Sequence, residues 1–162
     1  MDIIEVSLIR HAALRGGLET ISAPFNRPHG VGWDDCLTLD CQCLLTDIGD
    51  FLRACKEHEE SEDELVAAVT ALGAMDKRIG ADYAESRRAL GGAMKLFSAI
   101  AYTFDGEHVH RLRELLQHLR EEFESHLAFK EKVLFPLLRE RLSAERLEEL
   151  GRHARTREMI RS

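Results

Sequence analysis

The stretch FESHLAFKEKVLFPLL, residues 123–138, decides the fold of this chain and raises its main chemical question. Its apolar residues recur at intervals of three and four, the pattern of a helix that turns one face toward a protein core. His126 and Lys130 lie on that face, at positions where leucine is expected. A buried imidazole and a buried ammonium group both need polar partners, so these two residues predict a polar site inside the core.

The helix that contains this stretch has two interleaved series of inward positions, each with a spacing of seven. With an unbroken α-helical phase, Glu131 points roughly 120° away from the inward face, and Glu122 falls at its edge. Glu122 is therefore a further candidate for the site, and Glu131 is not. The two series are Leu112, Leu119, His126, Val133 and Leu116, Phe123, Lys130, Leu137.

An earlier segment carries the same kind of interruption. His58 and Glu62 occupy inward positions four residues apart, so both side chains leave one helical face and can reach one point. Most of the other carboxylates in the surrounding run EHEESEDE are expected to be solvated. The two inward series here are Ile48, Cys55, Glu62, Val69 and Phe51, His58, Leu65, Leu72.

The helical pattern extends over most of the chain and predicts an all-α protein. We expect helices at about 46–74, 80–104, 108–141 and 144–161, and the short joints between them favour an antiparallel four-helix bundle over residues 46–162. The helix at 80–104 shows a plain apolar face, with aromatic or leucine side chains at intervals of seven from Tyr83. Residues 1–45 hold clustered glycine and proline, which predicts an irregular N-terminal arm.

A third helix contributes a histidine to the predicted interior. His153 falls within the inward arc that contains Leu147, Leu150 and Ala154. Imidazoles from separate helices, together with Glu62, would be costly to bury without partners. Two explanations remain open: the side chains converge on iron or a similar cation, or Lys130 takes the place of the metal and pairs with Glu62 in a metal-free network.

Composition narrows the classes of function. The 162 residues suit one domain, and 29 acidic against 22 basic side chains give a net charge of −7 with no basic block for a phosphate backbone. Nucleic-acid binding is therefore not expected. Charged residues run through the first twenty positions, so we expect no signal peptide, no membrane span and a cytoplasmic location. The cysteines, at 36, 41, 43 and 55, match no paired zinc pattern and are expected to be thiols.

The quoted residues resemble a known family. HLAFKEKVLFPLL is similar to a signature of hemerythrin-like (HHE cation-binding) domains, with His126 matching the histidine of the motif and Phe135 and Pro136 at the expected distance. RLSAERLEELGRHARTREMI resembles the next helix of that family, with His153 at its histidine. KEHEESEDELVAA resembles another ligand helix, with His58 and Glu62 as ligands. Over about residues 47–162, the resemblance implies a bundle that holds a carboxylate-bridged non-haem iron pair and binds oxygen, nitric oxide or peroxide, or serves iron handling.

The chain also departs from the family pattern. Lys130 stands where the family places a bridging glutamate, and the helix at 80–104 lacks the expected histidine and acid. His118, Glu122, His11 or His29 could supplement the ligand set. We therefore expect a mononuclear or partly degenerate iron site, with zinc or no metal as alternatives, and a diatomic gas as a candidate ligand.

Other functions remain open. A metal-free interaction or regulatory bundle could dimerise through the arm that contains Trp33, a haem module could use His58 and His126 as axial ligands, and a phosphotransfer bundle could use His110. No Ser/His/Asp triad, phosphate-binding glycine loop or activated cysteine is recognisable, so the sequence favours a non-enzymatic role. Because bound iron can react with oxygen, an enzymatic activity stays open.

Overall fold

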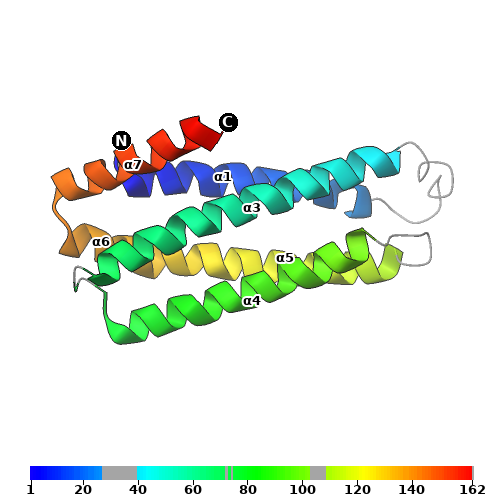
Figure 1. Cartoon of the computed structure of the whole chain (residues 1–162). Coiled ribbons are helices and arrows are strands. Elements are labelled where there is room, and N and C mark those ends of the chain that lie inside the picture. The colour runs from blue at the N-terminus through cyan, green and yellow to red at the C-terminus, as the bar shows by residue number, and fades with distance from the viewer. Residues whose placement is uncertain (27–39, 72, 74, 103–108, 162) are drawn as a thin grey trace.

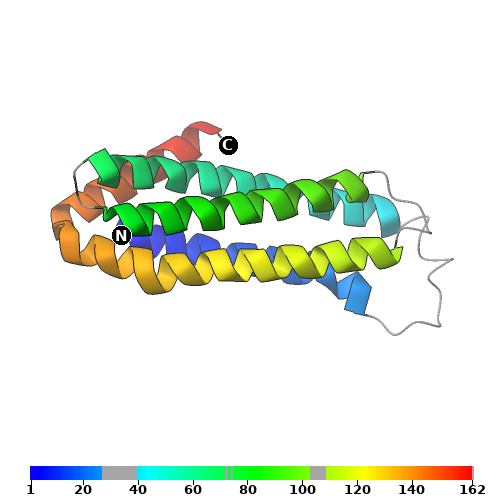
Figure 2. The ribbon, with the colours of Figure 1, turned by 90° about the horizontal axis from the view of Figure 1, so that it is seen from below.

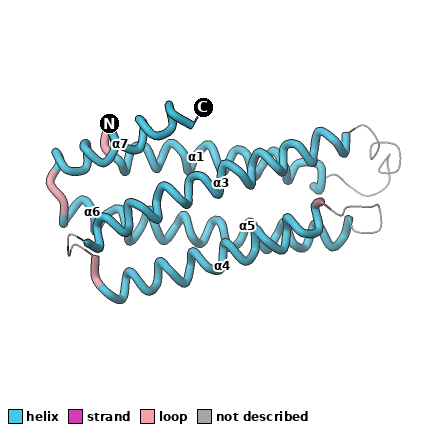
Figure 3. The backbone as a smooth tube through the Cα atoms, in the orientation of Figure 1, coloured by secondary structure: helices cyan, strands magenta, loops and turns pink. Residues whose placement is uncertain are grey.

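The computed structural model describes residues 1–26, 40–71, 73, 75–102 and 109–161, and these residues are almost entirely helical. In Figure 3 the described residues are drawn almost entirely as helix, with a few short loops and no strand. The predicted all-α class is confirmed. The helices are α1 (Ile3–Ser22, followed by a 3-10 turn, Ala23–Asn26), α3 (Asp40–Ala71), α4 (Lys77–Ala101), α5 (Val109–Phe129), α6 (Phe135–Arg141) and α7 (Ala144–Arg161).

A π-helical turn, Lys130–Leu134, joins α5 to α6 without a break, so the two form one long rod. This rod, α1, α3 and α4 lie side by side, and successive rods run in opposite directions (Figures 1 and 2). Contacts are most extensive between α4 and α5 and between α1 and α3. The described rods therefore form the expected antiparallel four-helix bundle.

The fourth rod of the bundle is α1, and not the helix at 144–161 as predicted. The prediction of an irregular N-terminal arm is thus wrong for residues 3–26 and for the start of α3 at Asp40. A capping box starts α1: the Asp2 carboxylate accepts a hydrogen bond from Glu5 N at 2.8 Å, and Glu5 Oε2 accepts one from Asp2 N at 2.9 Å. The rest of the predicted arm, including His29 and Trp33, lies outside the described residues.

Helix α1 continues through Gly16 and Gly17, and Gly17 lies at a helix contact. A Cβ on Gly17 would stand 3.1 Å from the ring of Phe51 in α3, so the absence of a side chain lets the two helices approach closely. On the same side of α1, the side chains of Leu14, Leu18 and Ile21 are buried. This burial outweighs the weak helix propensity of the Gly16–Gly17 pair.

Helix α7 packs on the outside of the bundle, against α1 (Figure 1). The backbones meet at Gly151, where a Cβ would lie 2.9 Å from main-chain atoms of Met1, Asp2 and Ile3. Arg155 donates a hydrogen bond to the carbonyl oxygen of Met1 at 2.9 Å. Because α7 covers α1 from outside, its buried residue Leu147 joins the apolar cluster that contains Ile3 and Ile4.

The interior consists of two apolar clusters with a polar layer between them. On α3 the layer falls between Phe51 and Cys55 of one cluster and Leu65 and Val69 of the other. This polar layer comprises His11, His58, Glu59, Glu62, His126 and Lys130, all of them buried.

The π-helical turn changes the register of the long rod. A π-helical turn holds one residue more than an α-helical turn, so the residues that follow are rotated by about 100°. Val133 was predicted to face inward but is 38% exposed, whereas Leu134 and Leu138, each one residue after a predicted inward position, are buried. Glu131 lies within the turn, where its side chain is 27% exposed and reaches His11 Nδ1 at 2.8 Å.

Candidate metal centre

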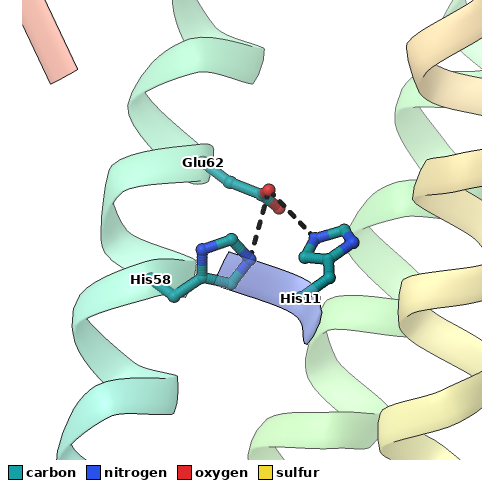
Figure 4. A group of neighbouring side chains, drawn as sticks. All are labelled: His11, His58 and Glu62. Atoms are coloured by element: carbon teal, nitrogen blue, oxygen red, sulfur yellow. Dashed lines mark hydrogen bonds and ion pairs between the residues drawn. The ribbon is translucent and has the colours of Figure 1, made fainter. Parts of the chain in front are cut away.

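Three side chains from two helices converge in the polar layer. His11 Nε2 lies 3.3 Å and His58 Nε2 lies 3.2 Å from the same atom, Glu62 Oε1 (Figure 4). One ligand atom from each of the three residues lies within 4.8 Å of the other two, and all three residues are buried. Ligand atoms bound to one ion at about 2.0–2.2 Å lie roughly 3.0–3.4 Å from one another. The group therefore has the composition and spacing to hold one metal ion.

His58 is the least satisfied member of this group. It is buried, yet neither of its ring nitrogens has a hydrogen-bond partner, because its contact with Glu62 is close but lacks hydrogen-bond geometry. A buried imidazole without hydrogen bonds is costly. A cation coordinated by Nε2 would remove part of this cost.

His11 is held between two carboxylates. Its Nδ1 lies 2.8 Å from Glu131 Oε1, and its Nε2 lies 3.3 Å from Glu62 Oε1. Carboxylates accept hydrogen bonds, and a neutral imidazole has one proton to donate. If that proton is on Nδ1, at the shorter contact, the Nε2 lone pair faces Glu62 and is free to bind a cation. Glu131 is itself held by Arg15, whose Nη1 donates to Glu131 Oε1 at 2.9 Å.

The other half of the polar layer is organised around Lys130. Its Nζ lies 2.8 Å from Glu59 Oε1 and 2.5 Å from Glu62 Oε2. His126 Nε2 lies 2.8 Å from Glu59 Oε2, and His126 Nδ1 lies 2.9 Å from Ser86 Oγ on α4. Glu62 thus faces the His11–His58 pair with one oxygen and Lys130 with the other.

The pKa values in this layer follow from burial and from these contacts. Burial alone would raise the pKa of Glu59, but the hydrogen bond from His126 and the charge of Lys130 outweigh it and lower that pKa from 4.5 to about 2. Burial is outweighed in the same way at Glu62, where Lys130 and His11 hold the pKa well below 4.5. Burial lowers the pKa of His126, which favours the neutral ring. A neutral His126 donates from Nε2 to Glu59 and accepts at Nδ1 from the Ser86 hydroxyl.

The structure brings together part of the predicted ligand set. His58 and Glu62 meet as expected, and His11 joins them, as one of the supplementary histidines. His126 lies in the same layer, but both of its nitrogens already have protein partners, so it offers no free lone pair to a metal or to a haem. Glu122 is half-buried and does not belong to the three-ligand group.

The prediction that His153 points inward is wrong. Its side chain is 73% exposed, and its nearest charged partner is Glu149 on the same helix. The physical reason is the position of α7, which packs on α1 through Leu147 and Gly151 and does not face the polar layer.

Three residues of the site region were not predicted. Glu59 was assigned to a solvated run, although it lies four residues after Cys55 and three before Glu62, a spacing that places it beside the inward face. Glu131 was excluded by an α-helical phase that the π-helical turn does not follow. Ser86 had no signal in the sequence, because a single serine beside an apolar face is common.

Within the described helices, no segment combines the length and the apolar character that crossing a membrane requires. In comparisons with known proteins, the chain matches no family model, no curated protein and no solved structure.

Proposed function

We propose that this chain is a hemerythrin-like metal-binding protein that holds a single non-haem iron ion at His11, His58 and Glu62. The observation that carries the proposal is the convergence of three buried ligand atoms, one of them on an imidazole whose nitrogens have no hydrogen-bond partner. Two imidazoles and one carboxylate are a ligand set typical of non-haem iron(II) with further coordination positions open. Zinc accepts the same donors and is the competing metal.

Bound iron would supply reversible redox chemistry and affinity for a small ligand such as oxygen or nitric oxide, which suits sensing or iron handling. The protein side chains set the conditions for that chemistry. Glu131 orients His11 through Nδ1, the usual role of a hydrogen-bonded carboxylate behind a histidine ligand. The Phe135 ring stacks on His11 at a centroid distance of 5.6 Å and helps to keep water from the layer.

Elemental analysis of protein from iron-replete medium tests this proposal. We expect about one iron per chain in the wild type, and less than a tenth of that in His58→Ala. His153→Ala is the matched control, because it removes an exposed histidine and should leave the iron content unchanged. Circular dichroism verifies that each variant is folded. Wild-type protein that takes up no iron or zinc, or a His58→Ala variant that keeps its iron, contradicts the proposal.

One observation favours a second function, a metal-free bundle for interaction or regulation. The Lys130 ammonium already neutralises part of the charge of Glu59 and Glu62, so the bundle can close without an ion. In that case neither iron(II) nor zinc would raise the Tm of the wild type or of His58→Ala.

A further inference from the structure

We propose that Lys130 is a tethered cation: its ammonium group takes the place of a second metal ion in the polar layer and limits the layer to one ion. The claim that the layer holds a first ion rests on the proposed function. The claim that Lys130 replaces a second ion rests on the contacts of Lys130 with Glu59 and Glu62.

The geometry around Lys130 is that of a bridging cation. The residue is completely buried, and its Nζ contacts one oxygen of Glu59 and one oxygen of Glu62. The two carboxylates come from adjacent turns of α3 and point at the same position. Without a positive charge between them, two buried carboxylates this close would repel each other.

The remaining charges nearby do not replace Lys130. Arg87 Nε lies 3.3 Å from Glu59 Oε2, but Arg87 is partly exposed and also pairs with Asp63 at 3.4 Å. His126 is held toward its neutral form by burial. Lys130 therefore provides the one fully buried positive charge among the described residues that contact both carboxylates.

Two consequences follow from this arrangement. The bundle does not need metal in order to fold, because both carboxylates keep a positive partner in the metal-free protein. A second divalent ion is also excluded, because Nζ occupies the position between the carboxylates and would repel it. The Glu62 oxygen that faces His11 and His58 remains available for one ion.

Lys130→Ala tests the proposal, with Lys132→Ala as the matched control because Lys132 is exposed on the same turn. The alanine variant keeps both carboxylates and opens space between them. We expect it to bind one more Co²⁺ per chain than the wild type, measured by elemental analysis after gel filtration. We also expect chelator-treated Lys130→Ala to melt roughly 10 °C below the wild type and Co²⁺ to reverse most of that loss. The control variant should match the wild type in both measurements.

A second variant separates charge compensation from simple packing. Adding Glu59→Gln to Lys130→Ala removes one of the two carboxylates, so the double variant should recover much of the lost Tm without Co²⁺ and should not take up the additional ion. If Lys130 merely fills space, Glu59→Gln gives no recovery.

The outcomes distinguish this inference from the proposed function. The measured quantity is the difference in bound Co²⁺ between Lys130→Ala and the wild type, which keeps its meaning even if the wild type binds none. No additional Co²⁺ in folded Lys130→Ala overturns the inference. A Lys130→Ala chain that neither Co²⁺ nor Glu59→Gln restores to the folded state overturns it as well.

Discussion

His11 and His58 both face Glu62, yet their rings are held very differently. Glu131 contacts His11 Nδ1 and can hold the ring in one tautomer, whereas no hydrogen bond orients the ring of His58. The affinity of a protein for a metal depends in part on a hydrogen bond to the second ring nitrogen of each histidine ligand. At the residue scale, Glu131 is therefore expected to matter for ion binding although it lies at the edge of the polar layer.

We predict that Glu131→Gln weakens iron(II) or zinc binding by about 10- to 100-fold, because the amide is a poorer hydrogen-bond acceptor than the carboxylate for His11 Nδ1–H. Competition with a fluorescent chelator measures this change. Glu124→Gln is the control: Glu124 also accepts a hydrogen bond from Arg15, at 3.1 Å, but the carboxylate at His11 Nδ1 is that of Glu131. Equal losses in the two variants would assign the effect to Arg15 and not to His11.

A second prediction at the residue scale concerns Cys55. Burial raises the pKa of this thiol to about 12, and the nearby Glu59 carboxylate acts in the same direction. At pH 8 we expect iodoacetamide to modify the exposed Cys43 and to leave Cys55 unmodified in the folded protein. Peptide mass spectrometry measures both sites, and Cys55 should react once the chain is unfolded in urea. Equal labelling of the two cysteines in the folded protein would be inconsistent with this burial.

At the scale of elements, the helices at 46–74, 80–104 and 144–161 were predicted within a few residues of α3, α4 and α7, apart from the earlier start of α3. Long series of apolar residues with a spacing of seven define such helices without reference to their neighbours. Helix α1 was missed because Gly16 and Gly17 were interpreted as helix breakers. Its stability comes from the capping box and from packing against α3, and the packing term depends on a partner remote in sequence.

Docking of α7 gives a prediction at this scale. Gly151→Ala should destabilise the protein by about 1–3 kcal/mol, because the new Cβ would meet the backbone of residues 1–3 and push the two helices apart. Urea denaturation followed by circular dichroism measures the free energy of unfolding. Gly16→Ala is the control: a Cβ there has no neighbour within 4 Å, so we expect stabilisation by about 0.5–1 kcal/mol. Destabilisation of similar size by both substitutions would contradict the proposed close approach at Gly151.

At the scale of the whole molecule, the polar layer couples stability to pH. Glu59 and Glu62 have lower pKa values in the folded chain than their usual 4.5. A lowered carboxyl pKa stabilises the fold above the unfolded value, and this stabilisation is lost as the pH falls through the folded value. The lowered pKa of His126 acts in the same direction below its usual 6.5, because the unfolded ring takes up a proton more readily.

We therefore predict that the free energy of unfolding falls as the pH is lowered from about 6.5 toward 2, most steeply below 4.5. Each unit by which a carboxyl pKa is depressed contributes about 1.4 kcal/mol. Urea titrations at a series of pH values, on chelator-treated protein, measure this dependence. Glu59→Gln should reduce the slope below pH 4.5. A free energy of unfolding that stays constant between pH 5 and 3 would show that these carboxylates are not held in their charged form by the fold.

Patterns along the sequence predict the helical class and a polar site inside a bundle. They also predict the inward positions of His58, Glu62, His126 and Lys130. These follow from the repeat of apolar residues along single helices, a property that neighbouring helices do not change. Which of these side chains meet depends on how the helices pack. The tertiary structure placed His11 beside His58, because α1 and not α7 completes the bundle. It also brought Glu131 to His11 within a π-helical turn that interrupts the α-helical phase. Partner choice and register depend on packing between helices, and no pattern within one helix encodes them.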